Sequence, residues 1–384
     1  MTLTTINLGP SLESALVSGH PWIYRNHLPR HRLTTGEWVR VEAGRAVAHG
    51  LYDGHGAIAV RVFSRETAPD DALIKRRVLD ALELRRPLTE RGDTDAYRLL
   101  YGEGDFLPAI VADRYGRFAV VKGYAASVRP LLPMVARTLG SALGLKGVVH
   151  RVEGDELEPL WGELPPPAES VLENGLRFHA DLRRGQKTGL FLDQRDNRML
   201  VRDLAAGRSV LNLFSYTGAF SVYALAGGAE LAVSVDVAEG AVQEAAASVE
   251  RNGLSVERHR ALAADAFTFL PQAAERGERY GLVVLDPPAL ARNAEQRRRA
   301  QRAYLKLNRA AFRAVEPGGF LATSSCTSQI SPEAFQRLVA EAAQAAGVRA
   351  QLVAERGQPL DHPVPASFPE GRYLKFLVYR VLPG

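Results

Sequence analysis

Residues 211–224 read LNLFSYTGAFSVYA, and the fold predicted for the second half of the chain rests mainly on them. It contains the end of an apolar strand, a turn with Gly218, and an apolar helix. Apolar segments alternate with amphipathic helices from here on, which indicates a mostly parallel α/β sheet covered on both faces. Because no strong helix separates the last two segments, we expect that pair to be antiparallel. The seven predicted strands are residues 209–214, 231–237, 257–264, 280–286, 318–326, 349–356 and 373–381.

Two smaller folded regions are predicted before this sheet. The first has short β segments separated by glycines and charged turns, which is typical of a small β-barrel. The second mixes strands and helices and predicts a small α/β domain. Three consecutive prolines after Leu164 mark its end. We therefore expect three domains, at residues 1–68, 69–165 and 166–384.

Composition narrows the class of protein. The chain has 384 residues, one cysteine and a net charge of +5, with a pI near 9.3. A single cysteine excludes an internal disulfide, and neither a signal peptide nor a membrane-length apolar run is evident, so we expect a cytoplasmic protein. The basic pI mildly favours a polyanionic partner. Nine histidines without ligand spacing argue against a metal site.

The turn at Gly218 suggests which cofactor the chain binds. In a doubly wound sheet, ligands lie at the carboxyl ends of the strands. A nucleotide pyrophosphate usually needs a glycine-rich turn, and this turn has one glycine, which argues against NAD and FAD. S-adenosylmethionine carries no phosphate, so it needs one close backbone approach and some polar groups, which Gly218 and its neighbours could supply. The alternative is that Gly218 only makes a turn.

Acidic residues follow the next two strands. Asp236 lies about 20 residues after the first turn, where a carboxylate can accept hydrogen bonds from both hydroxyls of a ribose. Its alternative role is to cap the following helix. For Asp265, capping a helix and accepting from an adenine amino group are equally favoured.

The fourth strand ends in Asp286-Pro287-Pro288. Both prolines have a fixed φ and no amide hydrogen, so the backbone turns stiffly there and would direct Asp286 towards the cleft. The alternative is a plain end to the strand. Cys326 follows the fifth strand and should lie at the same edge of the sheet. A free cysteine is most often a buried filler, but this position favours a nucleophile.

These motifs together resemble a known family. The resemblance is to the class I methyltransferases that make 5-methylcytosine in bacterial 23S ribosomal RNA, and it covers nearly the whole chain. HPWIYRNHL near the N-terminus is similar to that family's PUA-type RNA-binding domain, and YGEGDFLPAIVADRYG to its middle domain. The other matching stretches, in chain order, are GQKTGLFLDQRDNR, LNLFSYTGAFSVYALAGGA, VDVAEGA, LDPPAL, SSCTSQI and FPEGRYLKFLVYRV.

The resemblance implies a Rossmann-like class I methyltransferase domain with S-adenosylmethionine as cofactor. It implies 23S ribosomal RNA or an assembling large subunit as partner, and it suggests a homodimer. Phe191 and Arg195 would close the cofactor pocket, and Asp286 would face the reacting base. The full set of cofactor-binding positions is Phe191, Arg195, Asn212, Phe214, Ser215, Tyr216, Gly218, Asp236, Asp265 and Asp286.

The chemistry of cytosine explains a need for Cys326. Carbon 5 is too weak a nucleophile to take a methyl group directly, but a thiolate added at carbon 6 converts the ring into an enamine that can. Asp286 would hold a proton at N3 to help this addition. Relatives with two cysteines carry the second after a proline, where this chain has Ala289. The base that removes the carbon 5 proton is therefore open between water and Asp286.

A basic segment follows the Asp286 turn. Residues 291–313 contain eight basic residues and one acid, so their arginines could bind RNA phosphates, although most such runs are solvated helix faces. The candidate contacts are Arg292, Arg297, Arg298, Arg299 and Arg302. Because Ala289 cannot stack on a base, methylation of an exocyclic nitrogen is disfavoured. A guanine-modifying enzyme and a noncatalytic RNA-binding or ribosome-assembly factor remain as alternatives.

Overall fold

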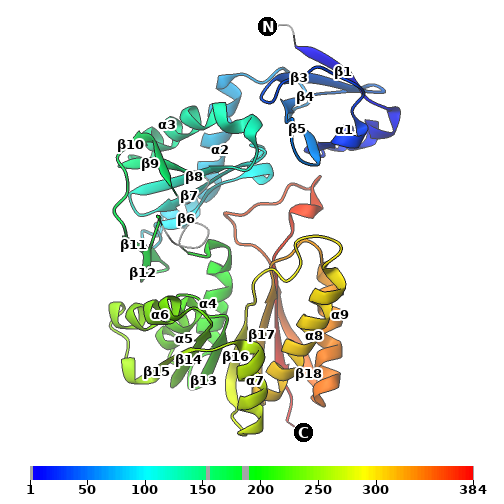
Figure 1. Cartoon of the computed structure of the whole chain (residues 1–384). Helices are drawn as coiled ribbons and strands as arrows, with labels where there is room; N and C mark the ends of the chain where they lie inside the picture. Colours follow the sequence, from blue (N-terminus) through cyan, green and yellow to red (C-terminus); the bar gives the residue numbers. More distant parts are fainter. Residues whose placement is uncertain (1–2, 153–155, 184–189, 384) are drawn as a thin grey trace. The chain divides into compact units, whose positions relative to one another are not determined.

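The computed structural model describes residues 3–152, 156–183 and 190–383 (Figure 1). Its contacts divide the chain into two compact units. The first unit comprises residues up to Gly175, His179–Leu192 and Leu360–Gly371. The second comprises Leu176–Phe178, Asp193–Pro359 and the residues from Arg372 onwards. The division into three domains stays a prediction.

The first unit begins with a five-stranded sheet, in the order β1-β3-β4-β5-β2. Strands β3, β4 and β5 correspond to the three predicted β segments, whereas the short β1 and β2 were not predicted. Apolar side chains such as Ile23, Val39, Val41 and Val60 form its core, and they are at most 2% exposed. The strands are β1 (Thr4–Asn7), β2 (Trp22–Tyr24), β3 (Trp38–Ala43), β4 (Ala46–Tyr52) and β5 (Ile58–Ser64), with helix α1 (Glu13–Ser18) beside them.

A second five-stranded sheet in this unit has the order β10-β9-β8-β7-β6, with α2 and α3 packed against it. The Asp70 carboxylate caps α2 by accepting the Leu73 N–H at 2.7 Å. This confirms the predicted long helix and the mixed α/β region. The elements are α2 (Asp71–Thr89), β6 (Ala96–Tyr101), β7 (Ile110–Tyr115), β8 (Phe118–Gly123), α3 (Leu132–Leu143), β9 (Gly147–Arg151) and β10 (Leu157–Gly162). A two-stranded sheet of β11 (Glu169–Glu173) and β12 (Leu176–Ala180) follows.

The second unit contains the predicted seven-stranded sheet. Its order is β15-β14-β13-β16-β17-β19-β18, and the first five strands are mutually parallel. β19 is antiparallel to both β17 and β18, which confirms the prediction for the last pair. The strands are β13 (Ser209–Leu213), β14 (Leu231–Asp236), β15 (His259–Ala263), β16 (Tyr280–Leu285), β17 (Val315–Ser325), β18 (Ala350–Arg356) and β19 (Lys375–Val381).

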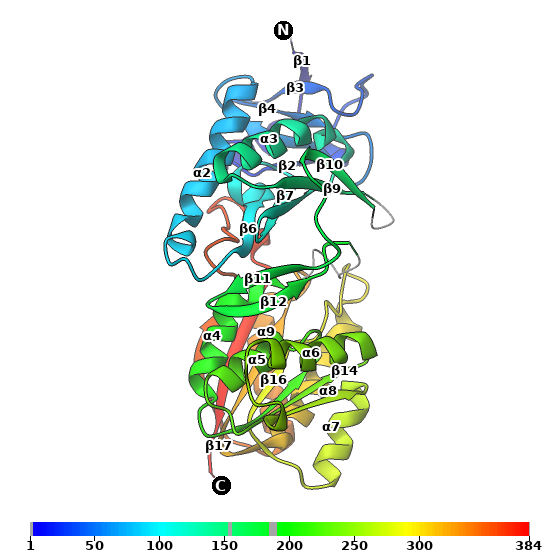
Figure 2. The same ribbon diagram turned by 90° about the vertical axis from the view of Figure 1, so that its left-hand side faces the viewer.

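Helices cover both faces of this sheet. α7, α8 and α9 pack on one face through buried side chains such as Leu270, Phe312 and Phe335, while α4, α5 and α6 lie together on the other (Figure 2). The helices are α4 (Arg195–Leu204), α5 (Ala219–Ala226), α6 (Glu239–Arg251), α7 (Ala266–Glu275), α8 (Arg297–Ala314) and α9 (Pro332–Ala346). Within the described residues, no helix combines the length and apolar character needed to cross a membrane.

Candidate active site

The carboxyl ends of the parallel strands meet at one edge of the second unit's sheet. The strand register places Leu213 opposite both Val235 and Leu285, and Leu285 opposite Thr323. The residues that leave β13, β14, β16 and β17 therefore start side by side. Phe214, Asp236, Asp286 and Cys326 all belong to these exits, so the fold brings together the segments that the sequence singled out.

The loop after β13 has a strained backbone. Phe214 and Tyr216 have φ values of 57° and 47°, and Gly218 has a φ of 76°. Positive φ is uncommon for aromatic residues and costs free energy that the surroundings must offset. The amides of Ser215 and Tyr216 are held by the Val235 carbonyl and the Asp236 carboxylate at 3.0 and 2.9 Å. Strain of this kind is concentrated at ligand-binding sites.

Gly218 meets two demands that a larger residue cannot. An added Cβ would lie 2.6 Å from the Cβ of Ala245 and 3.0 Å from its Cα, so α6 leaves no space for it. We expect Gly218→Ala to lower the free energy of unfolding by about 2–5 kcal/mol, since positive φ and overpacking both oppose it. Gly240→Ala is the matched control, because that helical glycine has nothing within 4 Å of an added Cβ. This variant should raise the free energy of unfolding by about 0.5–1 kcal/mol. Urea unfolding measures both; equal stability of the two variants would contradict the prediction.

Asp236 ties two loops together. Its Oδ2 accepts the Tyr216 N–H at 2.9 Å and its Oδ1 accepts the Ala238 N–H at 3.0 Å. The N-cap residue of α6 is Ala238, so the alternative role of Asp236 as the capping residue is wrong. The carboxylate instead fixes the strained loop against the end of β14.

Asp265, by contrast, is the N-cap of α7, and its Oδ1 accepts the Phe267 N–H at 2.9 Å. The capping alternative is therefore confirmed for this exposed residue, and its contact with an adenine stays a prediction.

Two buried polar atoms near the strained loop have no hydrogen-bond partner among the described residues. They are Oδ1 of Asn212, which is fully buried, and Oγ of Ser215, which belongs to a residue that is 7% exposed. The Asn212 amide nitrogen donates to Ser221 at 3.0 Å, which fixes the side chain. Buried polar atoms are normally paired, so these two fit a ligand with polar groups of its own.

The two residues predicted to close the cofactor pocket belong to different units of the chain. Arg195 begins α4 and is 1% exposed, with Nε 3.4 Å from the Asp196 carboxylate. Phe191 is half-buried and belongs to the first unit, so its place at the cofactor site stays a prediction.

Asp286 is held by two side chains that the sequence did not single out. Its Oδ1 accepts hydrogen bonds from the Ser324 hydroxyl and from the Gln194 amide, the latter at 3.0 Å. Asn197 in turn donates to the Gln194 side-chain oxygen at 2.6 Å. The carboxylate therefore has a fixed orientation, which is what a residue that positions a substrate ring requires.

Cys326 is the residue directly after β17, and it is partly exposed. Its sulfur lies 3.9 Å from the Pro287 carbonyl oxygen, so it faces the turn that follows Asp286. The next residue, Thr327, is anchored by a 2.6 Å hydrogen bond to the Ala291 carbonyl. A fully buried filler is thus excluded, and the thiol and Asp286 share the end of the β16 and β17 pair.

Two ionisable residues near Cys326 were not predicted from the sequence to belong to the site. Tyr304 of α8 is fully buried, and burial raises the pKa of its phenol, with Cys326 and Asp286 raising it further. Lys375 of β19 is 4% exposed, and burial lowers the pKa of its amine to about 8. The available signal in the sequence was a lysine inside the apolar segment YLKFLVYRV, because lysine is rarely found in a buried strand.

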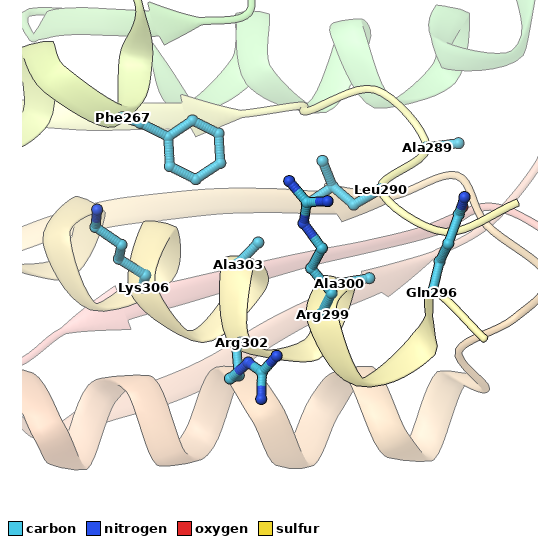
Figure 3. A pocket seen from close by; sticks show the side chains of 9 residues that line it. All are labelled: Phe267, Ala289, Leu290, Gln296, Arg299, Ala300, Arg302, Ala303 and Lys306. Carbon is cyan, nitrogen blue, oxygen red and sulfur yellow. The ribbon is translucent and has the colours of Figure 1, made fainter. Parts of the chain in front are cut away.

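The predicted RNA-contacting arginines lie on or just before α8, and all five are exposed. Arg299 and Lys306 line a groove of about 610 Å³ with an apolar floor that includes Phe267, Leu290 and Ala303 (Figure 3). In the close-up, Arg299 extends towards Leu290, whereas Arg302 points away from Phe267. Lys306 lies 5.9 Å from the centre of the Phe267 ring. The groove therefore combines cationic side chains with an aromatic face.

The chain is similar to families and proteins of known type. Residues 133–368 match the family described as S-adenosylmethionine-dependent methyltransferase, and residues 6–65 match the PUA-like domain family. The ribosomal RNA large subunit methyltransferase I of Klebsiella pneumoniae strain 342 is 36% identical, with 98% of each chain covered. The enzyme of that name from Aeromonas salmonicida strain A449 is 37% identical, over 96% of this chain and 97% of its own length.

Solved structures agree in fold. A protein from Streptococcus mutans described as a SAM-dependent methyltransferase superposes with a TM-score of 0.87 at 23% identity, over 99% of this chain and 100% of its own. A second structure, described as complexed with SAH, has a TM-score of 0.88 at 24% identity and the same coverage.

Proposed function

The chain belongs to the S-adenosylmethionine-dependent methyltransferase family, and we propose that it methylates carbon 5 of a cytosine in 23S ribosomal RNA. Relatives that match nearly its whole length are named as large-subunit ribosomal RNA methyltransferases, which supports the substrate class. The proposal that carbon 5 is the methylated atom rests on the position of Cys326. The only cysteine of the chain is partly exposed and faces the turn after Asp286.

The residues present fit the cofactor. Asn212 and Ser215 offer buried, unpartnered polar atoms, and Asp236 and the strained loop lie beside them. Asn212, Phe214, Ser215, Tyr216 and Gly218 would form the floor of its site. Asp236 would take the ribose hydroxyls and Asp265 the adenine end, while Arg195 would line the pocket. S-adenosylmethionine, when bound, supplies a methyl group on a positively charged sulfur.

Cys326 and Asp286 would divide the chemistry at the base. The Cys326 thiolate attacks carbon 6 of cytosine and forms a C–S bond, while Asp286 holds a proton at N3, so that electron density reaches carbon 5. After carbon 5 has been methylated, its hydrogen leaves as a proton and the thiolate is eliminated. Ala289 provides no second thiol for that proton, so water or Asp286 accepts it.

RNA binding is assigned to two places. The PUA-like region and the exposed arginines on or just before α8 would contact phosphates and hold the strand while the target base leaves its stack. These arginines are Arg292, Arg297, Arg298, Arg299 and Arg302. A ribosomal RNA substrate implies that the protein works in the cytoplasm. The homodimer suggested by the family resemblance stays a prediction.

Mapping of modified nucleotides tests this function directly. In a strain that lacks the protein, 23S ribosomal RNA should lose one 5-methylcytosine, which mass spectrometry of nuclease fragments detects as a loss of 14 Da. Restoring the wild-type gene should restore the modification. Loss of a methylated guanine instead would establish the alternative target, and unchanged RNA would remove the methyltransferase proposal.

A further inference from the structure

Lys375 is buried against the segment that carries Cys326. It is the first residue of β19, and the register with β17 places it opposite Ser325, the residue before the cysteine. Its Nζ donates hydrogen bonds to the carbonyl of Thr327, the residue after the cysteine, and to the carbonyl of Tyr373 at 2.9 Å. The amine therefore lies against the backbone that holds the thiol.

The partners of Lys375 are unusual for a buried cation. Both hydrogen-bond acceptors are neutral carbonyls, and in the part of the chain that the structure describes no carboxylate forms an ion pair with Nζ. A buried ammonium without a counter-ion is costly. Burial accordingly lowers the pKa of Lys375 to about 8, while a charged Cys326 favours the ammonium form. Lys375 can thus exchange a proton near neutral pH, and the Cys326 thiolate can act as its counter-ion.

The other ionisable groups around the thiol serve this exchange less well. Tyr304, on the side of α8, has a raised pKa and stays protonated, so it can donate but not accept. Asp286, at the end of β16, accepts hydrogen bonds from Ser324 and Gln194. Of these three groups, Lys375 on β19 is the one whose pKa lies near neutral pH, so it can both take up and return the proton of the thiol.

We propose that Lys375 is a positioning residue that controls the ionisation of Cys326. The Sγ–H bond breaks, an Nζ–H bond forms on the neutral amine, and the resulting ammonium stabilises the thiolate until it attacks a pyrimidine ring. When the thiolate is eliminated from the product, the proton can return to it. This inference deepens the proposed function and rests on the role of Cys326 as nucleophile.

Alkylation of Cys326 by iodoacetamide tests the coupling without RNA or methyl transfer. Because the full-length chain has a single cysteine, the rate reports on this sulfur alone. The midpoint of its pH dependence should lie below the usual ~8.5 of a free thiol. In Lys375→Met it should rise by about one pH unit, which slows alkylation at pH 7 about tenfold. Lys75→Met, at an exposed lysine of α2, should match the wild type.

A charge-retaining variant tests the role of the positive charge. Lys375→Arg stays protonated, so alkylation should keep a low midpoint and methyl transfer should continue, because the thiolate still has a cation beside it. An unchanged midpoint in Lys375→Met overturns the electrostatic coupling, and a midpoint in Lys375→Arg as high as that expected for Lys375→Met overturns the role of the charge. Neither result depends on which base is methylated.

A second measurement uses the wild-type lysine and covers the case in which Lys375→Met does not fold. With ¹³C-labelled lysine, NMR follows the titration of the six lysines of the chain. Replacement of Cys326 by alanine should lower the pKa of Lys375 below its wild-type value, because the thiolate favours the ammonium. An identical titration in both proteins would overturn the coupling, whereas methylation by Cys326→Ala would refute the proposed function instead.

Discussion

Replacing Cys326 by alanine should reduce RNA methylation by at least about 10³-fold, because the covalent route to an activated carbon 5 is lost. Affinity for S-adenosylmethionine and for RNA should survive, since alanine is smaller than cysteine and leaves the backbone that follows β17 unchanged. Single-turnover methylation with labelled cofactor measures the first effect, and equilibrium binding measures the second.

A mechanism-based trap sharpens this prediction. RNA that carries 5-fluorocytidine at the target position has no proton to lose from carbon 5, so the thioether at carbon 6 should persist and shift the protein on a denaturing gel. The adduct should form with the wild type and not with Cys326→Ala. Full activity of Cys326→Ala would refute the role of Cys326 as nucleophile. If the wild type and the variant both bind RNA but neither methylates it, the noncatalytic alternative would be favoured.

Replacing Asp286 by asparagine should lower the rate of methyl transfer by about 10²–10⁴-fold, the usual contribution of a residue that transfers a proton. Asparagine has nearly the same shape and can still hydrogen-bond, but it cannot hold a transferable proton at N3. The hydrogen bonds from Ser324 and Gln194 show that the position of the group is set by its neighbours, so kcat should fall far more than affinity for the cofactor.

Asp203→Asn provides the matched control, because it makes the same change at an exposed position of α4 in the same unit. It should leave methylation and the free energy of unfolding unchanged. Activity of Asp286→Asn within about threefold of the wild type would show that Asp286 only shapes the turn before the two prolines, the alternative considered for this motif.

Much of the fold could be predicted because its signals are local. Each strand of the large sheet is a short apolar segment bounded by a turn, and the residue that leaves a strand is fixed by where that segment ends. The prediction missed β1 and β2 because strands of four and three residues carry too little pattern. It also missed β10, because none of the residues of this strand is buried and its apolar residues do not alternate regularly with polar ones.

Details of the site depended on hydrogen bonds that local patterns do not reveal. Asp236 looks like a helix cap in the sequence, but its carboxylate accepts amide hydrogens from two separate loops. Gln194, the N-cap residue of α4, reaches Asp286 from a position 92 residues earlier in the chain, so only the folded chain brings the two side chains together. Neither partner has a fixed spacing from the other in sequence.

Local sequence patterns are enough to predict which residues follow the carboxyl ends of the parallel strands, and hence that Gly218, Asp236, Asp286 and Cys326 lie at one edge of the sheet. The position of each strand can be inferred from a local run of apolar residues, so predicting which residues share this edge needs no long-range information. The position of Lys375 against the segment that carries Cys326 could be found only from the folded chain. That neighbour comes from the register of an antiparallel pair 50 residues apart, which is set by how the two strands pack and not by any residue near the cysteine.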